Sequence, residues 1–267
     1  WTATLSVTSS GVTSLSNLVK LKAGAVTDAL GNASGEAQAR FAVDTVATEA
    51  TVVIAADSLS DGSQTAQVIV TFTEAPLGFD ASDLIAVGGT LSGGSFDGTG
   101  LIYTATYTAT DGFSGTGSVT LSGVYTDAVL NVGATGANDT VSIDRANPSA
   151  TVALTAASLN DTTSATQLTI TFSKAPVGFS EADLTVVGGS LSGGSFDGTG
   201  LIYTATYTAT DGFNNTGSVT LSGAYTDAVL NVGATGASDT VAIDRANAGA
   251  AVALAAASLS DTTSTTQ

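Results

Sequence analysis

The sequence predicts an all-β protein made of tandem sandwich domains, and two observations lead to this prediction. First, the segment LSGGSFDGTGLIYTATYTATDGF at 91–113 recurs unchanged at 191–213, one hundred positions later. Second, the hydrophobic residues alternate with polar ones, which is the pattern of half-buried strands. A repeat of about 100 residues has the size of one autonomous domain and is too long for one turn of a solenoid.

The alternation is clear in the segment 168–172. Leu168, Ile170 and Phe172 share one face, while Thr169 and Thr171 take the other. Val68, Val70 and Phe72 repeat the pattern in the preceding unit, and YTATYTAT at 103–110 alternates in the same way. No stretch keeps a helical period of 3.6 over three turns, so helices are not expected.

Each repeat is predicted to contain seven short strands separated by turn-forming clusters. The turns are expected at GG (88–89), SGG (92–94), DGTG (97–100) and DGFSGTG (111–117). In the first complete repeat the strands are expected near 50–56, 65–73, 84–88, 94–96, 101–110, 117–122 and 139–144. Seven strands in about 100 residues indicate an immunoglobulin-like sandwich, although the Cys and Trp hallmarks of antibody domains are absent.

The repeats divide the chain into four parts. Residues 1–48 are the C-terminal half of a repeat, beginning with a strand at 1–8, because WTATLSVT matches YTATYTAT at 103–110. Residues 49–148 and 149–248 are complete repeats, and 249–267 is the first strand of the next. The two ends cannot complement each other into a full unit, so we interpret the chain as part of a longer array arranged as an extended rod.

Composition excludes several classes of function. Twenty-three acidic residues face six basic ones, giving a formal charge of −17, which disfavours nucleic acid and anionic membrane surfaces as partners. No apolar run is long enough for a membrane span. Cys, His and Met are absent, which excludes disulfides, thiolate or imidazole metal sites and catalytic triads. An enzyme is not expected.

The acidic residues are expected to gather where one repeat joins the next. If every strand reverses direction, the linker aspartate of one repeat lies beside two loops of the following repeat. The expected groups are Asp44, Asp83 and Asp127 at one joint, and Asp144, Asp183 and Asp227 at the next. Asn131 and Asn231 add a carbonyl oxygen, and Asp244 is the linker aspartate after the last complete repeat. Converging carboxylates repel unless neutralised, and hard oxygen ligands suit Ca²⁺.

Two other interpretations of the acids stay open. Aspartates in loops commonly cap turns and keep a surface soluble. Arg145 and Arg245 follow the linker aspartates and could pair with them in place of a metal. A second, weaker cluster is expected at the opposite end of the repeat. Its members are Asp57, Asp61 and Asp111, and Asp161, Asp211 and Asp261 repeat parts of it.

Four segments in order, TFSKAPVGFSEADLTVVGG (171–189), YTATYT (203–208), YTDAVLN (225–231) and an Ile-Asp linker, resemble the bacterial Ig-like repeats of very large surface adhesins. The resemblance covers effectively the whole chain. It implies a non-catalytic extender segment at the bacterial cell surface, outside the cell, in a biofilm or host-adhesion protein, with Ca²⁺ stiffening the joints. The chain departs from the family in its linkers, DTVATE (44–49), DRANPS (144–149) and DRANAG (244–249), and in Leu130 and Leu230 where the family has glycine.

The sequence leaves two further functions open. Identical units present identical lateral faces, so a self-assembling extracellular filament, sheath or surface layer is the alternative, with copies of the chain as lateral partners. In the adhesin the partners are the neighbouring repeats of the same chain. An array of carbohydrate-binding modules requires exposed aromatic platforms, whereas Tyr103 and Tyr107 are expected to fill the sandwich. The threonines of 104–110 are read as the exposed face of a strand.

Overall fold

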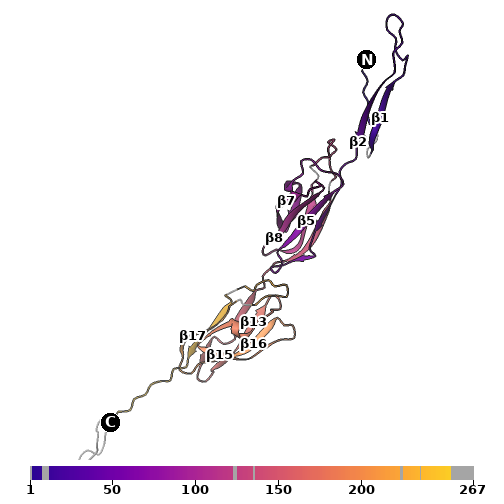
Figure 1. Ribbon diagram of the computed structural model, residues 1–267. Helices are drawn as coiled ribbons and strands as arrows, with labels where there is room; N and C mark the ends of the chain where they lie inside the picture. Colours follow the sequence, from indigo (N-terminus) through magenta and orange to yellow (C-terminus); the bar gives the residue numbers. More distant parts are fainter. Residues whose placement is uncertain are drawn as a thin grey trace, which may run out of the picture. The chain divides into compact units, whose positions relative to one another are not determined.

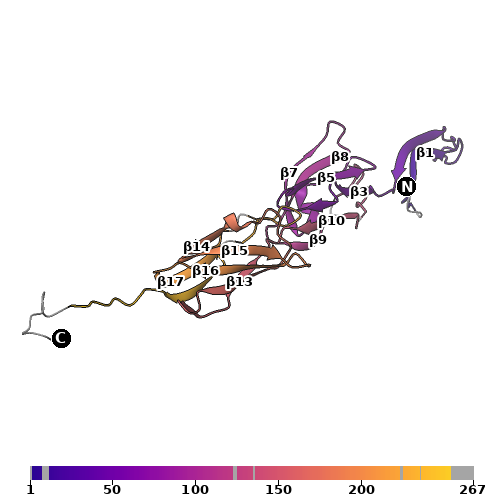
Figure 2. The ribbon, with the colours of Figure 1, turned by 90° about the horizontal axis from the view of Figure 1, so that it is seen from below.

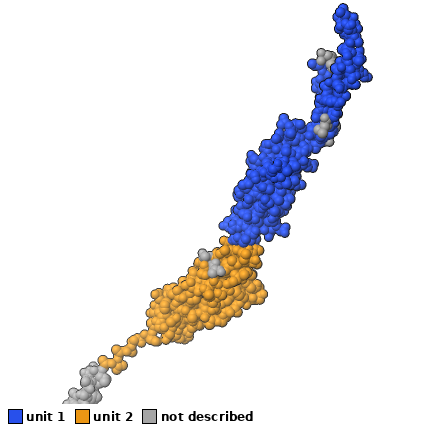
Figure 3. All heavy atoms as spheres, viewed as in Figure 1, with its two compact units in different colours: residues 1–146 blue, residues 147–267 orange. Residues whose placement is uncertain are grey.

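The computed structural model separates the chain into two compact units, residues 1–146 and 147–267, which are coloured separately in Figure 3. It describes residues 2–7, 12–122, 125–134, 136–222, 225–234 and 236–253. Each unit contains one complete repeat, and each repeat is a sandwich of two four-stranded sheets. The predicted all-β fold of tandem immunoglobulin-like domains is confirmed.

The first complete repeat packs a fully antiparallel sheet against a mixed one (Figure 1 and Figure 2). The antiparallel sheet has the order β3-β5-β8-β7, formed by Ala50–Ile54, Thr65–Phe72, Ile102–Ala109 and Gly89–Phe96. The mixed sheet has the order β4-β10-β9-β6, formed by Ser58–Leu59, Asn138–Asp144, Ser114–Leu121 and Leu84–Val87. Strand β4 runs parallel to β10, and a short 3₁₀ helix, η1 (Ala81–Asp83), leads into β6.

The second complete repeat has the same topology. Its antiparallel sheet has the order β11-β13-β16-β15, formed by Ala150–Leu154, Ala165–Phe172, Ile202–Ala209 and Gly189–Phe196. Its mixed sheet has the order β12-β18-β17-β14, formed by Ser158–Asn160, Ser238–Asp244, Asn214–Leu221 and Leu184–Val187. The helix η2 (Glu181–Asp183) is the counterpart of η1. Identical topology follows from the nearly identical hydrophobic pattern of the two repeats.

The core lies between the sheets, and the alternating residues supply it as expected. Val68, Val70 and Phe72 of β5 are buried, as are Leu168, Ile170 and Phe172 of β13. Tyr103 and Tyr107 fill the sandwich, and the Tyr107 hydroxyl donates to the Val87 carbonyl at 2.6 Å, which links the two sheets. Burying each large side chain contributes about 1.5–3 kcal/mol, so these strands dominate the stability of the repeat.

Aromatic rings gather at the end of the core from which the loop after β9 emerges. They meet mostly edge to face, with centroids 4.9 Å apart for Phe72 and Phe79 and 5.2 Å apart for Phe72 and Tyr125. This geometry suits the quadrupoles of the rings and contributes about 1 kcal/mol per pair beyond simple burial. The cluster anchors the base of the loop that starts at Tyr125.

The predicted strands are confirmed, with three differences. The strand expected at 50–56 ends at Ile54, and the chain then crosses to the other sheet as β4. Strand β9 begins at Ser114 rather than 117. The expected turn at SGG (92–94) is wrong, because β7 runs through these residues from Gly89 to Phe96 with a bulge between Ser92 and Ser95.

The glycines of this bulge allow close packing. A Cβ atom on Gly94 would overlap the hydroxyl oxygen of Tyr103, so the strand can lie over this ring only where it carries no side chain. Gly93 has φ of +67°, a left-handed conformation that favours glycine. A glycine pair inside a strand therefore marks a bulge here.

The terminal segments form less of a repeat than expected. Strands β1 (Thr13–Leu21) and β2 (Ala37–Asp44) make an antiparallel hairpin, but residues 2–7 form no strand. In the complete repeats the equivalent strand β8 lies between β5 and β7, and residues 2–7 and 12–44 contain no counterpart of either. Residues 249–253 are also irregular, while 254–267, with Asp261, lie outside the described residues.

No helix in the described residues is long and apolar enough to cross a membrane. The described helices are the two 3₁₀ turns, of three residues each.

Candidate cation site at the joint of the first complete repeat

The loop after Tyr125 is organised by one carboxylate. Asp127 Oδ1 accepts the backbone N–H groups of Val129 and Asn131, both at 2.9 Å, and the Asp127 N–H donates to the Asn131 carbonyl at 3.0 Å. An aspartate that binds backbone groups two and four residues ahead makes a compact turn. Leu130 sits in this turn with φ of +71°, an uncommon conformation for a branched side chain.

The same loop holds the linker that enters the repeat. The Asn131 side-chain amide donates to Asp127 Oδ2 at 2.7 Å and to the carbonyl oxygens of Asp44 at 3.2 Å and Val46 at 3.3 Å. Farther along the linker, the Thr48 carbonyl accepts the Ala134 N–H at 2.9 Å and the Tyr125 hydroxyl at 3.2 Å. We call the linker residues 44–48 and the loop 125–134 together the first joint.

Three carboxylates gather at the first joint. One oxygen each from Asp44, Glu74 and Asp127 lies within 4.8 Å of the others. Carboxylates this close repel one another when all are charged. Asp127 is 1% exposed, so water screens it poorly. Among the described residues no lysine or arginine pairs with it, and the group can take a hard divalent cation.

Burial raises the pKa of Asp127, but the hydrogen bonds from Asn131, Val129 and Leu130 outweigh burial and hold this pKa below its ordinary value. The carboxylate is therefore charged at neutral pH. Asp44 Oδ1 accepts the Thr13 hydroxyl and the Val46 N–H, both at 3.0 Å. Both carboxylates are thus preorganised by their own turns before any ion arrives.

The sequence placed Asp44 and Asp127 together, and they are neighbours in the structure. Asp83 is not part of this group, because its side chain accepts the Asp80 N–H at 2.9 Å and closes the capping box of η1. The third carboxylate comes instead from Glu74, which sequence reasoning missed. The signal was present, since Glu74 follows β5 at the same end of the sandwich as the linker.

The residues predicted for the next joint are divided between the two units. Asp144 ends β10 in the first unit, where its Oδ1 accepts the Ala146 N–H at 3.3 Å. Asp183 closes the capping box of η2 in the second unit, and Asp244 is exposed. Asp227 is 3% exposed and organises its loop with Asn231 as Asp127 does with Asn131. A metal bound by these residues stays a prediction.

The second, weaker cluster contains an arginine. Arg145 Nε lies 3.0 Å from Asp61 Oδ1, its Nη2 lies 3.4 Å from Asp111 Oδ1, and its Nη1 donates to the Ala109 carbonyl. The carbonyl of Asp57 accepts the Ser142 N–H. The arginine therefore supplies the positive charge between Asp61 and Asp111, and Arg245 repeats the arrangement with Asp161 and Asp211.

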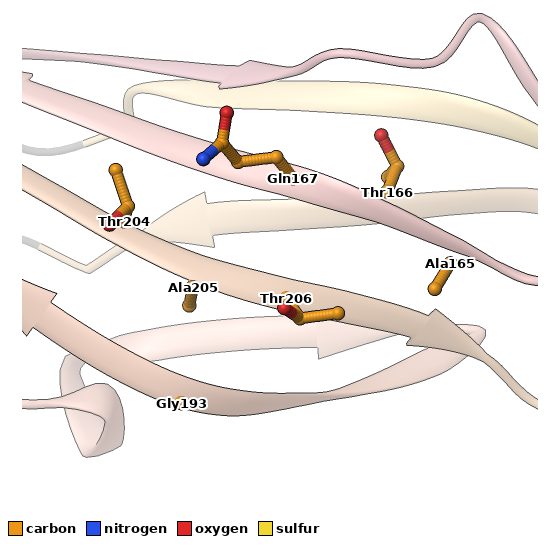
Figure 4. A pocket seen from close by; sticks show the side chains of 7 residues that line it. All are labelled: Ala165, Thr166, Gln167, Gly193, Thr204, Ala205 and Thr206. Carbon is orange, nitrogen blue, oxygen red and sulfur yellow. The ribbon is translucent and has the colours of Figure 1, made fainter.

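A shallow hollow lies on the outer face of the sheet β11-β13-β16-β15 (Figure 4). Its volume is about 330 Å³, and the outward side chains around it include Gln167, Thr204 and Thr206. An equivalent hollow of about 230 Å³ lies beside Gln67, Thr104 and Thr106. Neither is lined by an aromatic or charged residue, so neither offers the stacking platform that the carbohydrate-binding alternative requires.

The fold and the first joint together define a class of protein, a tandem array of immunoglobulin-like sandwiches in which the linker at 44–48 is held by the repeat that follows it. A family model of the bacterial Ig-like domain matches residues 44–143 and again residues 144–245. The chain therefore belongs to the bacterial Ig-like domain family. A comparison with curated proteins finds no match.

Solved structures with similar folds include three bacterial proteins. The adhesin InvE of Yersinia pseudotuberculosis is 18% identical, with a TM-score of 0.29 over 73% of this chain and 58% of that one. Invasin, described as a bacterial integrin-binding protein, is 14% identical, with a TM-score of 0.33 over 80% and 44%. InvD of Y. pseudotuberculosis is 19% identical, with a TM-score of 0.27 over 77% and 61%. The chain spans less than two thirds of the length of each of these structures.

Proposed function

We propose that this chain is a non-catalytic extender segment of a bacterial cell-surface adhesin, acting outside the cell, and that Ca²⁺ stiffens the joints between its repeats. The observation that carries the proposal is the first joint. The loop 125–134 holds the linker through its backbone carbonyls, and Asp44 of the linker brings its carboxylate to those of Glu74 and Asp127. Membership in the bacterial Ig-like domain family supports the structural role.

The mechanism follows from linkage. An ion that binds only when Asp44 of the linker and Asp127 of the loop are together stabilises the docked linker over the detached one. At a free ion concentration of 100 times Kd, detachment becomes about 100-fold rarer. A docked linker restricts bending between repeats, so a distal part of the adhesin is held at a greater distance from the cell.

The decisive experiment compares the chelated chain with the same chain in Ca²⁺. We expect hydrogen exchange of the linker amides at 44–48 to slow, the melting temperature to rise and the radius of gyration from X-ray scattering to increase. Mg²⁺ at the same ionic strength should do less, because it gives up its water reluctantly.

Glu74→Gln is the informative variant, since no described hydrogen bond of the loop depends on this side chain. Glu49→Gln is the matched control, an exposed acid in the same unit with the same change of charge. The Ca²⁺ response should weaken at least tenfold in the first variant only. Unchanged exchange, melting and scattering on adding EGTA would exclude ion-stiffened joints. Sedimentation as ordered polymers would favour the filament over the extender.

A further inference from the structure

The two complete repeats differ in charge beside an otherwise identical loop. Residue 74, two positions after β5, is glutamate, whereas residue 174, two positions after β13, is lysine. This single exchange reverses the charge that faces the loop aspartate. The pair of Glu74 and Asp127 carries two negative charges, while Lys174 and Asp227 together carry none.

The loop itself is the same in both repeats. Asp227 Oδ1 accepts the N–H groups of Val229 and Asn231 at 3.0 and 2.9 Å, compared with 2.9 Å for both bonds of Asp127. The Asn231 amide donates to Asp227 Oδ2 at 2.9 Å. Because the backbone turn and its hydrogen bonds are unchanged, the difference in charge acts on the same carboxylate oxygen.

Lys174 places a cation directly on that oxygen. Its Nζ lies 2.8 Å from Asp227 Oδ2, and the Asp227 side chain is 4% exposed. Burial raises the pKa of Asp227, but the hydrogen bonds from Lys174 and Asn231 outweigh it, so this pKa is lowered and the aspartate stays charged. A buried carboxylate that is paired and hydrogen-bonded needs no further counter-ion.

The ammonium group of Lys174 is also direct evidence that the loop carboxylate accepts a cation on Oδ2. In the first repeat no lysine or arginine among the described residues fills this role, and two further carboxylates face the same aspartate instead. One carboxylate environment thus occurs in two forms within one chain, with and without a cation of its own.

We propose that Lys174 is an internal counter-cation that replaces the divalent ion in the second complete repeat, so that the two joints differ in their dependence on Ca²⁺. The first joint needs an ion from solution and responds to its concentration. In the second repeat, Lys174 neutralises the loop aspartate Asp227 at any ion concentration. This inference rests on the proposed Ca²⁺ site of the first joint. It implies that residue 74 determines the ion requirement of the first complete repeat and residue 174 that of the second.

The test exchanges the two residues in the full chain. Glu74→Lys should abolish the Ca²⁺ response of the first repeat, and Lys174→Glu should create one in the second. Hydrogen exchange read by mass spectrometry separates the repeats, because TAQVIVTFT at 65–73 and ATQLTITFS at 165–173 differ in mass. In the unaltered chain we expect Ca²⁺ to slow exchange at least tenfold in the first peptide and to leave the second unchanged.

Lys174→Gln controls for loss of the ion pair without added negative charge, and it should destabilise the second repeat without creating a Ca²⁺ response. The inference is overturned if the unaltered second repeat responds to Ca²⁺ as the first does, or if Lys174→Glu gains no response while the first repeat keeps its own. In either case the proposed extender with Ca²⁺ at the first joint stands. If the unaltered first repeat shows no response, both proposals fail together.

Discussion

Replacing Arg145 by alanine should lower the free energy of unfolding of the first complete repeat by about 3 kcal/mol. The Arg145 side chain is 9% exposed and that of its partner Asp61 is 16% exposed, at an Nε–Oδ1 distance of 3.0 Å. Removing the guanidinium leaves Asp61 with a poorly solvated charge and deprives the Ala109 carbonyl of its donor. The contact with Asp111, which is 77% exposed, adds little.

The second repeat supplies a matched control. Arg245 makes the same contacts, with an Nε–Oδ1 distance of 3.1 Å to Asp161, but the Asp161 side chain is 51% exposed. Water can solvate this carboxylate once the arginine is gone, so Arg245→Ala should cost only about 1 kcal/mol. The difference of about 2 kcal/mol corresponds to roughly thirtyfold in the equilibrium constant of opening.

Hydrogen exchange in increasing urea measures both repeats in one sample, through the β5 peptide 65–73 and the β13 peptide 165–173. Arg145→Ala should increase opening in the first peptide and leave the second within error, and Arg245→Ala should do the reverse by a smaller amount. Equal losses in the two variants would refute the argument from burial. A loss below 1 kcal/mol for Arg145→Ala would show that the ion pair contributes no more than an exposed one.

Two further predictions concern the linker and the acid range. Thr48 is fully buried, and its hydroxyl has no hydrogen-bond partner among the described residues. Thr48→Val should therefore raise the free energy of unfolding of the first repeat by about 1 kcal/mol, as measured by urea unfolding. A lower urea midpoint would contradict this. The hydroxyl of Thr99 donates to Asp97 and holds the pKa of this carboxyl below its ordinary value of 3.8. The charged Asp97 therefore stabilises the fold fully above about pH 4, and this stabilisation is lost as the pH falls through the lower pKa of the folded state. Asp97→Asn should therefore reduce the fall in melting temperature between pH 5 and pH 2.5, and an unchanged fall would exclude this role.

Most of the fold could be predicted because its signals are local. Alternation assigns the inward face of β5 and β8 residue by residue, and burial of Val68, Val70, Tyr103 and Tyr107 follows from it. The bulge at 92–95 could not be predicted in this way. Glycines permit both a turn and a close approach of strands, and the Tyr103 ring that distinguishes the two comes from the neighbouring strand.

The candidate site was predicted in part, for a related reason. Strand direction alone brings the linker residue Asp44 and the loop residue Asp127 to one end of the sandwich. It does not determine which third acid completes the group. Asp83 lies at the same end, but its carboxylate is used in capping η1 through the Asp80 N–H, and Glu74 takes the place instead. The direction of a side chain depends on the hydrogen bonds that compete for it, and these exist only in the folded chain.

The sequence by itself determined the number of complete repeats, which face of each strand points into the core, and the clustering of acids near the linkers, because each follows from spacing along the chain. The tertiary structure alone decided the role of each charge. In the folded chain Arg145 pairs with Asp61 and Lys174 pairs with Asp227, while three carboxylates, including that of Asp44, lie together beside the linker. The physical reason is that Coulomb energy depends on distance and burial, and residues up to 84 positions apart acquire both only when the sandwich closes.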